Sequence, residues 1–188
     1  TGDQLAHARR ALEESGWGVD ALYVHSWCSE PLFLEAWAAK IPEAGAAPDA
    51  GYVFAAHSLP QRLAGEAYAG QIEAAGDVIG RRLGAACWTV GWQSVPANAR
   101  EPWLGPPVQE VLDIFAREGL RQVVEVPLGF TADHVETLYD IDIVHRRHAE
   151  GLGLDWRRAA SLNDDPRFVG ALAKVVETAL ATPDGFRP

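Results

Sequence analysis

Short apolar runs alternate with longer segments of helical periodicity along most of this chain, and this alternation restricts the folds open to it. Apolar runs at 52–56, 88–92 and 122–126 are typical of buried strands, whereas the segments at 71–83 and 108–118 have the apolar spacing of helices. Neighbouring parallel strands need a long crossover, and a helix supplies it. We therefore expect an α/β fold in which a parallel sheet carries helices on both faces.

The same criteria predict the remaining elements of the chain. They are helices at 3–15, from Pro31 and at 166–180, strands at 21–24 and 156–159, and a loop at 42–48 rich in Ala, Gly and Pro. A long helix is expected to begin near Thr131, because the hydroxyl of this residue can cap a first turn.

Composition excludes several classes of partner and site. The formal charge of the 188 residues is -10, so a phosphate backbone would be repelled and nucleic acid is disfavoured. The two cysteines, Cys28 and Cys87, are too few to hold an iron-sulfur cluster within this segment, and none is predicted from it. No stretch approaches the roughly 18–20 consecutive apolar residues of a membrane span. The expected location is the cytoplasm.

Polar side chains collect where the expected strands end. His57 follows the first of the three apolar runs, Ser94 follows the second, and Glu136 follows the third at a greater distance. In open parallel sheets, ligands bind outside the carboxyl ends of the strands, so these residues are expected at one edge. Asp140 lies four residues beyond Glu136, which places two carboxylates on one helix face, where they could bind a hydrated divalent cation.

Each of these residues taken alone also has a structural interpretation. A histidine after a strand often bonds neighbouring backbone, and an acid in the first turns of a helix is favoured by the helix dipole, so His57 and Glu136 carry weight only together. His134 is interpreted as a structural histidine at a helix end rather than a direct ligand, and His145 and His148 as outer-face residues. Four aromatic residues could line a flat pocket or belong to the core or its rim: Trp92, Trp103, Phe130 and Tyr139.

Four blocks of sequence resemble those of the ferrochelatases, most closely the water-soluble bacterial members. They are FAAHSLP at 54–60, GWQS at 91–94 with PWLGP at 102–106, PLGFTADHVETLYDID at 127–142, and SLNDDPRF at 161–168. The blocks occur in the family's order and spacing, and the similarity extends over essentially the whole chain. Their combination is specific, unlike any single block.

The resemblance implies a Rossmann-like chelatase domain, one of two in the family, with a porphyrin in the cleft between them. It implies insertion of Fe2+, as a substrate, into protoporphyrin IX or coproporphyrin III in haem biosynthesis. His57 and Glu136 are then the catalytic pair, without an assignment of base and ligand, and the expected metal contacts are these two residues and Asp140. The expected porphyrin contacts are Trp92, Trp103, Phe130, His134 and Tyr139. Where the family commonly has a third acid, this chain has Val144.

The resemblance also bears on domain organisation and partners. Family members carry a long additional segment before the position of Thr1, so the chain is expected to be the carboxyl-terminal part of a longer protein. Residues 1–165 are expected to form the chelatase domain, incomplete at its start, and residues 166–188 a final helix and tail that could pack on the missing first domain. A monomer or homodimer is expected, with the porphyrin as partner and peripheral membrane contact compatible with so apolar a ligand.

Two other functions are compatible with the same architecture. A cobalt or nickel chelatase acting on a sirohydrochlorin-type ring can work as half-length chains, but the GWQS, PWLGP and SLNDDPRF blocks argue against it. A non-catalytic tetrapyrrole-binding module is the other alternative. The presence of both His57 and Glu136 argues against that one.

Overall fold

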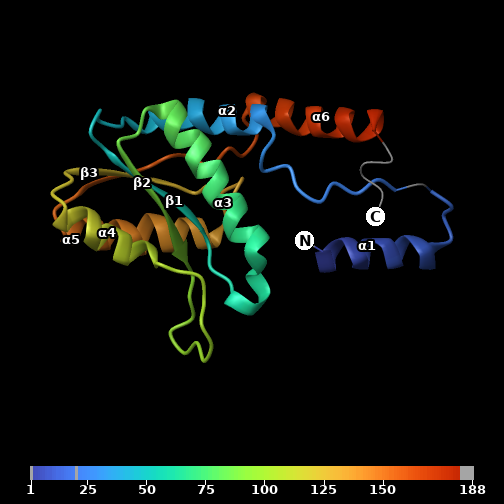
Figure 1. The fold of residues 1–188 in the computed structure, drawn as a ribbon, viewed down its shortest axis with the longest axis horizontal. Coiled ribbons are helices and arrows are strands. Elements are labelled where there is room, and N and C mark those ends of the chain that lie inside the picture. The colour runs from blue at the N-terminus through green and yellow to red at the C-terminus, as the bar shows by residue number, and fades with distance from the viewer. Residues whose placement is uncertain (1, 20, 183–188) are drawn as a thin grey trace.

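A single four-stranded parallel sheet organises the chain (Figure 1). The computed structural model describes residues 2–19 and 21–182, without the side chains of residues 2, 3, 65 and 66. The strands are β1 (Gly51–His57), β2 (Cys87–Gln93), β3 (Gln122–Val126) and β4 (Asp155–Arg158), in the spatial order β2-β1-β3-β4. The expected α/β fold with a parallel sheet is confirmed.

Helices cover both faces of this sheet. One face carries α2 (Pro31–Lys40), α3 (Gln61–Leu83) and α6 (Pro166–Ala181); the other carries α4 (Val108–Arg117), the π-helix η2 (Thr137–His145) and α5 (Arg146–Gly151). Figure 1 shows α2 and α6 along one side of the sheet and α4 and α5 along the other. Between the layers lie two separate groups of buried apolar side chains.

The strand pleat explains the two groups. Successive side chains of a strand point to opposite faces, and in β1 Phe54 belongs to the core under α2 and α3, whereas Val53 and Ala55 belong to the core under α4. All three are completely buried. A strand buried on both faces reads as a continuous apolar run, which is why the sequence identified β1 so readily.

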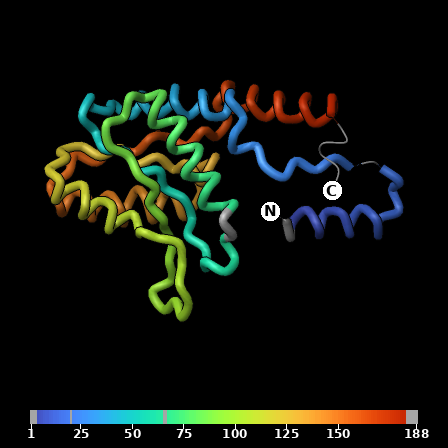
Figure 2. Tube along the Cα trace, viewed as in Figure 1, coloured from blue at the N-terminus to red at the C-terminus, as the bar shows by residue number. Residues whose placement is uncertain are grey.

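Local boundaries differ from expectation at several points of the chain. Residues 21–24 are not a strand but an irregular segment between α1 (Gly2–Ser15) and α2, because an apolar run needs a free sheet edge to pair with and this one lies away from the sheet (Figure 2). Helix α3 begins ten residues before the expected start, its first turn preceded by Pro60. Part of the expected loop at 42–48 is a short 3-10 helix, η1 (Ile41–Ala44), which ends at Gly45 with a φ of 75°.

The amino-terminal helix and α6 present side chains away from the sheet. Helix α1 (Gly2–Ser15) lies apart from the body of the domain (Figures 1 and 2). Helix α6 packs on α2, and its Val169, Val176 and Leu180 are more than half exposed. Packing of α6 on a further domain stays a prediction. Residues 183–188 of the expected tail lie outside the described residues.

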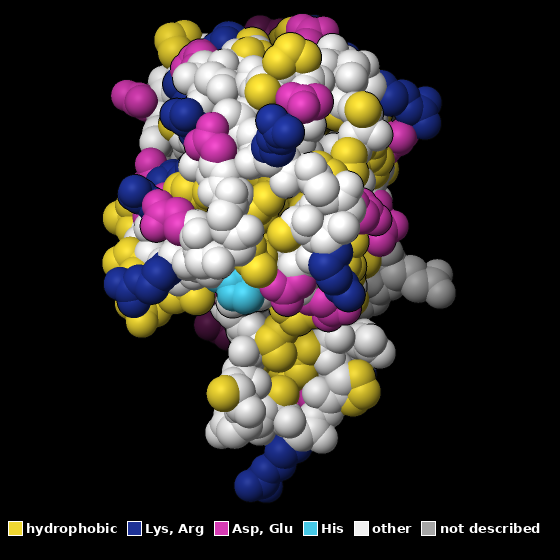
Figure 3. Space-filling view, turned by 90° about the vertical axis from the view of Figure 1, so that its left-hand side faces the viewer, with side chains coloured by type: hydrophobic (Ala, Val, Ile, Leu, Met, Phe, Trp, Pro, Cys, Tyr) yellow, Lys and Arg dark blue, Asp and Glu magenta, His cyan; other side chains and the backbone are white. Residues whose placement is uncertain are grey.

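The surface carries charges of both signs. Figure 3 shows acidic and basic side chains interspersed with apolar ones on one face of the molecule. No helix in the described ranges combines the length and the apolar composition needed to cross a bilayer.

Candidate active site

The connections that follow β1, β2 and β3 converge at one edge of the sheet. His57 ends β1 directly opposite Gln93, the last residue of β2. The connection after β3 reaches the same place, where the N–H of Gly129 donates to the carbonyl of Ala55 at 3.0 Å. A side chain at Gly129 would collide with Ala56, since a Cβ there would lie 2.8 Å from that residue's Cβ. Glycine therefore lets the third connection approach His57.

The imidazole of His57 is fixed by its own strand end. Its Nδ1 lies 2.5 Å from the carbonyl oxygen of Ser58, and because a carbonyl only accepts, Nδ1 carries the proton of this hydrogen bond. In the neutral ring, Nε2 then has the free lone pair. The hydroxyl of Tyr68 donates to the backbone carbonyl of His57 at 3.0 Å, and burial raises the pKa of Tyr68, which keeps it a donor.

Glu136 faces that lone pair from the connection after β3. Its Oε2 lies 3.7 Å from Nε2 of His57, with the two side chains 47% and 34% exposed. The separation is too long for a direct hydrogen bond. Two donor atoms at this distance can nonetheless share one ion, because metals such as Zn2+ hold nitrogen and oxygen ligands at about 2.0–2.2 Å. The pair can thus take up a proton or a divalent cation.

Asp140 lies one turn further along the same helix and contacts the residue that follows β2. The hydroxyl of Ser94, which follows β2 with a φ of 63°, donates to Oδ2 of Asp140 at 2.5 Å. Both residues line a cavity of about 290 Å³, together with Trp92, Gln109 and His145. The expected second carboxylate therefore faces this small cavity, whose lining does not include His57 or Glu136.

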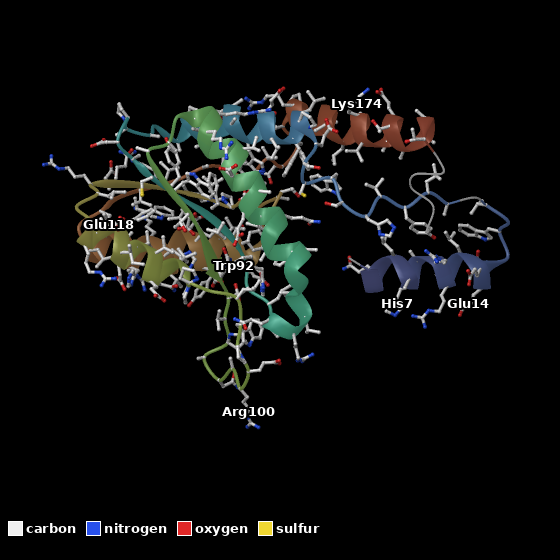
Figure 4. The ribbon with its side chains drawn as sticks, in the orientation of Figure 1. His7, Glu14, Trp92, Arg100, Glu118 and Lys174 are labelled. Carbon is white, nitrogen blue, oxygen red and sulfur yellow. The ribbon has the colours of Figure 1, made fainter. Side chains whose placement is uncertain are left out.

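The five expected porphyrin contacts lie in different environments. Trp92 is 3% exposed and packs on Tyr68, with ring centroids 5.6 Å apart, at the end of β2 (Figure 4). Trp103 is half-buried in the loop after β2, which runs out to Arg100 at its tip and returns to pair with Pro60. Phe130 and His134 stack edge to face at 4.8 Å, and Tyr139 is 57% exposed. Their roles as ring contacts stay predictions.

His134, not Thr131, caps the helix that carries Glu136. The chain becomes helical at Val135, and Nδ1 of His134 accepts the N–H of Glu136 at 3.2 Å. Thr137 also binds the backbone of His134, through both donation and acceptance by its hydroxyl. The expected cap at Thr131 is wrong because residues 131–134 are not helical, so Thr131 lies too far before the first turn. The structural interpretation of His134 agrees with this geometry.

The helix itself is wider than expected over nine residues. From Thr137 to His145 it is a π-helix, a form rare in proteins and frequent at functional sites. Its buried residues are Thr137, Ile141 and His145, four residues apart, which matches a turn wider than the 3.6 residues of an α-helix. A 3.6-residue period therefore misplaces side chains along this helix.

His145 is the clearest case, because the expectation of an outer-face residue is wrong. The side chain is 2% exposed, and its Nδ1 lies 2.7 Å from Oε1 of Glu125, which is completely buried in β3. The other carboxylate oxygen of Glu125 accepts the indole N–H of Trp156 at 3.0 Å. The end of η2 is thus fastened to the sheet by a buried polar contact. His148, one turn later, is partly exposed and pairs with Asp113 at 2.9 Å.

Comparison with known proteins identifies the family. The family model described as ferrochelatase matches residues 1–180. The chain belongs to the ferrochelatase family. The blocks at 54–60 and 127–142 that suggested ferrochelatase contribute His57 and Glu136, the two residues that meet at the sheet edge.

Curated ferrochelatases are similar over most of the chain. It is 37% identical to the coproporphyrin III ferrochelatase of Halalkalibacterium halodurans, over 92% of this chain and 58% of that protein. It is 39% identical to the ferrochelatase of Herpetosiphon aurantiacus, over 89% and 57%, and 35% identical to the coproporphyrin III ferrochelatase of Bacillus subtilis, over 91% and 58%. The chain spans less than three fifths of the length of these relatives.

Sequence reasoning missed several residues that shape the site. They include Tyr68, whose hydroxyl bonds the end of β1, and Glu125, which lies inside an apolar strand run. A charged residue in the middle of such a run is a usable signal, since a carboxylate is almost never fully buried without a partner. No local pattern indicates that its partner is His145.

Proposed function

We propose that the protein to which this chain belongs inserts Fe2+ into a porphyrin, protoporphyrin IX or coproporphyrin III, as a step of haem biosynthesis in the cytoplasm. The observation that carries the proposal is the approach of Nε2 of His57 to Oε2 of Glu136, 3.7 Å apart at the open edge of the sheet. Names of similar proteins include both ferrochelatase and coproporphyrin III ferrochelatase.

The reaction needs a proton acceptor and temporary ligands. Two N–H bonds of the free-base ring break, two protons leave, and four bonds form between the ring nitrogens and Fe2+, which stays ferrous. His57 offers a lone pair on Nε2 because Nδ1 holds the proton bonded to Ser58, and Glu136 offers a carboxylate. Both groups suit general-base catalysis and metal ligation.

The pair leaves most of the ion's coordination sphere for the ring. In this proposal His57 and Glu136 hold the cation or the departing protons, and Asp140 is an outer contact on the path of the metal. Tyr139 and Phe130 lie on the same helix and connection as Glu136 and are proposed as ring contacts, with Trp92, Trp103 and His134. A cleft that favours a puckered ring would lower the barrier by differential binding.

Replacement of His57 tests the proposal in the complete protein. His57→Ala should lower the rate of Fe2+ insertion about 100-fold or more, since loss of a positioned proton acceptor typically has this effect. His148→Ala is the matched control, because it removes an imidazole whose partner is Asp113 on the outer surface. Activity of His57→Ala within a few fold of wild type would contradict the proposal.

The choice of metal and ring separates the remaining candidates. Wild-type protein should insert Fe2+ into protoporphyrin IX or coproporphyrin III, and comparison of the two initial rates identifies the preferred ring. Insertion of cobalt or nickel into a sirohydrochlorin-type ring, without activity on either porphyrin, would favour the other chelatase class. Porphyrin binding without insertion would indicate a non-catalytic module.

A further inference from the structure

The connection between β4 and α6 is hydrogen-bonded to the connection that carries Glu136. Asn163 forms three hydrogen bonds to it: its N–H donates to the carbonyl of Thr131 at 2.7 Å, its Oδ1 accepts the N–H of Asp133 at 2.9 Å, and its Nδ2 donates to Oδ2 of Asp133 at 3.0 Å. Residues 30 positions apart in sequence are thereby held together through both backbone and side chain.

Asn163 adopts a backbone conformation that few residues tolerate. Its φ is 48°, in the left-handed region, where asparagine and glycine are the favoured residues. Within SLNDDPRF, the asparagine therefore has two roles: it permits the turn and supplies the side-chain bonds.

The carboxylate of Asp133 is bound from a second direction. Oδ1 accepts the hydroxyl of Ser161 at 2.9 Å and is ion-paired with the guanidinium of Arg158. Burial alone would raise the pKa of Asp133, but the hydrogen bonds from Asn163 and Ser161, with the charge of Arg158, outweigh it and hold that pKa below its usual value. The carboxylate is thus kept ionised as the centre of the cluster.

Arg158 extends this cluster into the π-helix. Its other nitrogen donates to Oδ2 of Asp142 at 2.8 Å, and Arg158 is only 14% exposed. One guanidinium therefore joins a residue before η2 to a residue within it. Asp133 lies three residues before Glu136, whose own side chain is half exposed, so the position of Glu136 depends on how the start of the helix is held.

We propose that Asn163, together with Arg158 and Ser161, is a positioning residue for Glu136. These three residues, called the bracket below, hold the chain at the start of η2 in place, so that the carboxylate of Glu136 faces His57. The proposal rests on the function proposed above, in which the facing of Glu136 and His57 is productive. Rates of such reactions are sensitive to placement, because a shift of about 1 Å at the reacting groups can cost about 100-fold.

Asn163→Gly in the complete protein isolates the side-chain bonds. Glycine keeps the positive φ and the backbone bond to Thr131 but removes both bonds to Asp133. We expect kcat for Fe2+ insertion to fall about tenfold, with KM for the porphyrin within about twofold of wild type, since positioning affects the chemical step. Asp165→Asn is the matched control, because Asp165 caps α6 two residues later and bonds to Arg167 and not to Thr131 or Asp133. It should keep wild-type kcat within about twofold.

A double-mutant comparison distinguishes positioning from general destabilisation. In a Glu136→Gln background, Asn163→Gly should lower the remaining activity less than about twofold, because the group that it positions is already lost. A full tenfold further loss would overturn the proposal, as would an unchanged kcat in the single variant while His57→Ala is inactive.

Amide hydrogen exchange over residues 131–140 supplies a measurement that does not need activity. Asn163→Gly should raise exchange in this segment about tenfold relative to Asp165→Asn, because the bonds that hold it are removed. Unchanged exchange overturns the proposal whatever the activity.

If wild-type protein inserts no metal, the proposed function fails, and exchange still decides whether the bracket holds the helix. If Asn163→Gly does not fold, Ser161→Ala, which removes one bond to Asp133, answers the same exchange and kcat questions with the same signs.

Discussion

The two faces of the sheet are built from different kinds of interior. Under α2, α3 and α6 the contacts are between apolar side chains, centred on Phe54 and Trp37. Under α4 and η2 the apolar core also contains buried polar groups, among them Glu125 and Gln93. One of the helices that cover this face, η2, is a π-helix. On the second face the buried contact between Glu125 and His145 holds the end of the helix that follows Glu136, whereas the first face has no such contact among the described residues of its core.

The largest expected effect on stability lies on the apolar face. Trp37 is completely buried, and its indole N–H has no protein partner in the described part of the chain, so replacement removes packing without breaking a hydrogen bond. Trp37→Ala should lower the free energy of unfolding by about 3–5 kcal/mol. Denaturant unfolding of the complete protein measures it, with the 75% exposed Trp17 as the site of a neutral control, Trp17→Ala. Equal losses for Trp37→Ala and Trp17→Ala would show that the apolar core of the first face contributes no more to stability than an exposed side chain does.

A smaller loss of stability is expected when the buried hydrogen bonds of Glu125 on the second face are removed. Glu125→Ala leaves the Nδ1 of His145 and the indole N–H of Trp156 without their buried acceptor. Unfolding free energy should fall by about 2–3 kcal/mol, since a stranded buried donor costs about 1–3 kcal/mol and only the donor of His145 is fully buried, that of Trp156 being partly exposed. Glu125→Gln keeps one carbonyl oxygen and should lose about half as much. An alanine variant as stable as wild type would show that the carboxylate is tolerated rather than stabilising.

The smallest effect is expected at Gln93, and it should have the opposite sign. The side chain is 2% exposed, and neither its oxygen nor its nitrogen has a protein partner within residues 2–19 and 21–182. Gln93→Leu should leave the unfolding free energy unchanged or raise it by up to about 1 kcal/mol, because an unpaired buried amide is replaced by an apolar group of similar size. Thermal unfolding monitored by circular dichroism is sufficient. A loss of stability would mean that the amide of Gln93 has a hydrogen-bond partner in solution, such as a buried water. The polar groups buried on the second face would then form more hydrogen bonds than the protein contacts alone indicate.

Much of the fold was predictable because its signals are local. Strands β1, β2 and β3 appear as apolar runs, and their ends mark the edge where His57 lies. Ala21–Val24 has the same local signal but pairs with no strand, since pairing depends on a free edge and not on composition. The sequence predicts too short a helix α3, because glycines near its start argue against helical structure there. Further along α3, Gly80 is required by packing, since a Cβ at this position would lie 2.8 Å from the side chain of Trp88.

The candidate site was predictable only in part. The order of the sequence blocks indicated His57 and Glu136, and the strand-end rule placed them on one edge. The position of His145 could not be predicted, because its burial depends on a π-helix and on the acceptor Glu125 in β3. The bracket at Asn163 was equally hidden, since the residues that it joins are 30 positions apart.

The sequence by itself determined the parallel α/β architecture, the strand ends that carry the polar residues and the membership of the family. Those properties follow from side-chain periodicity and from ordered motifs, which are contained in short stretches of chain. Only the tertiary structure decided that η2 is a π-helix, that His145 is buried, and that Nε2 of His57 and Oε2 of Glu136 lie 3.7 Å apart. The reason is physical: these properties depend on contacts between segments distant in sequence, and no local pattern fixes the distance between two such segments.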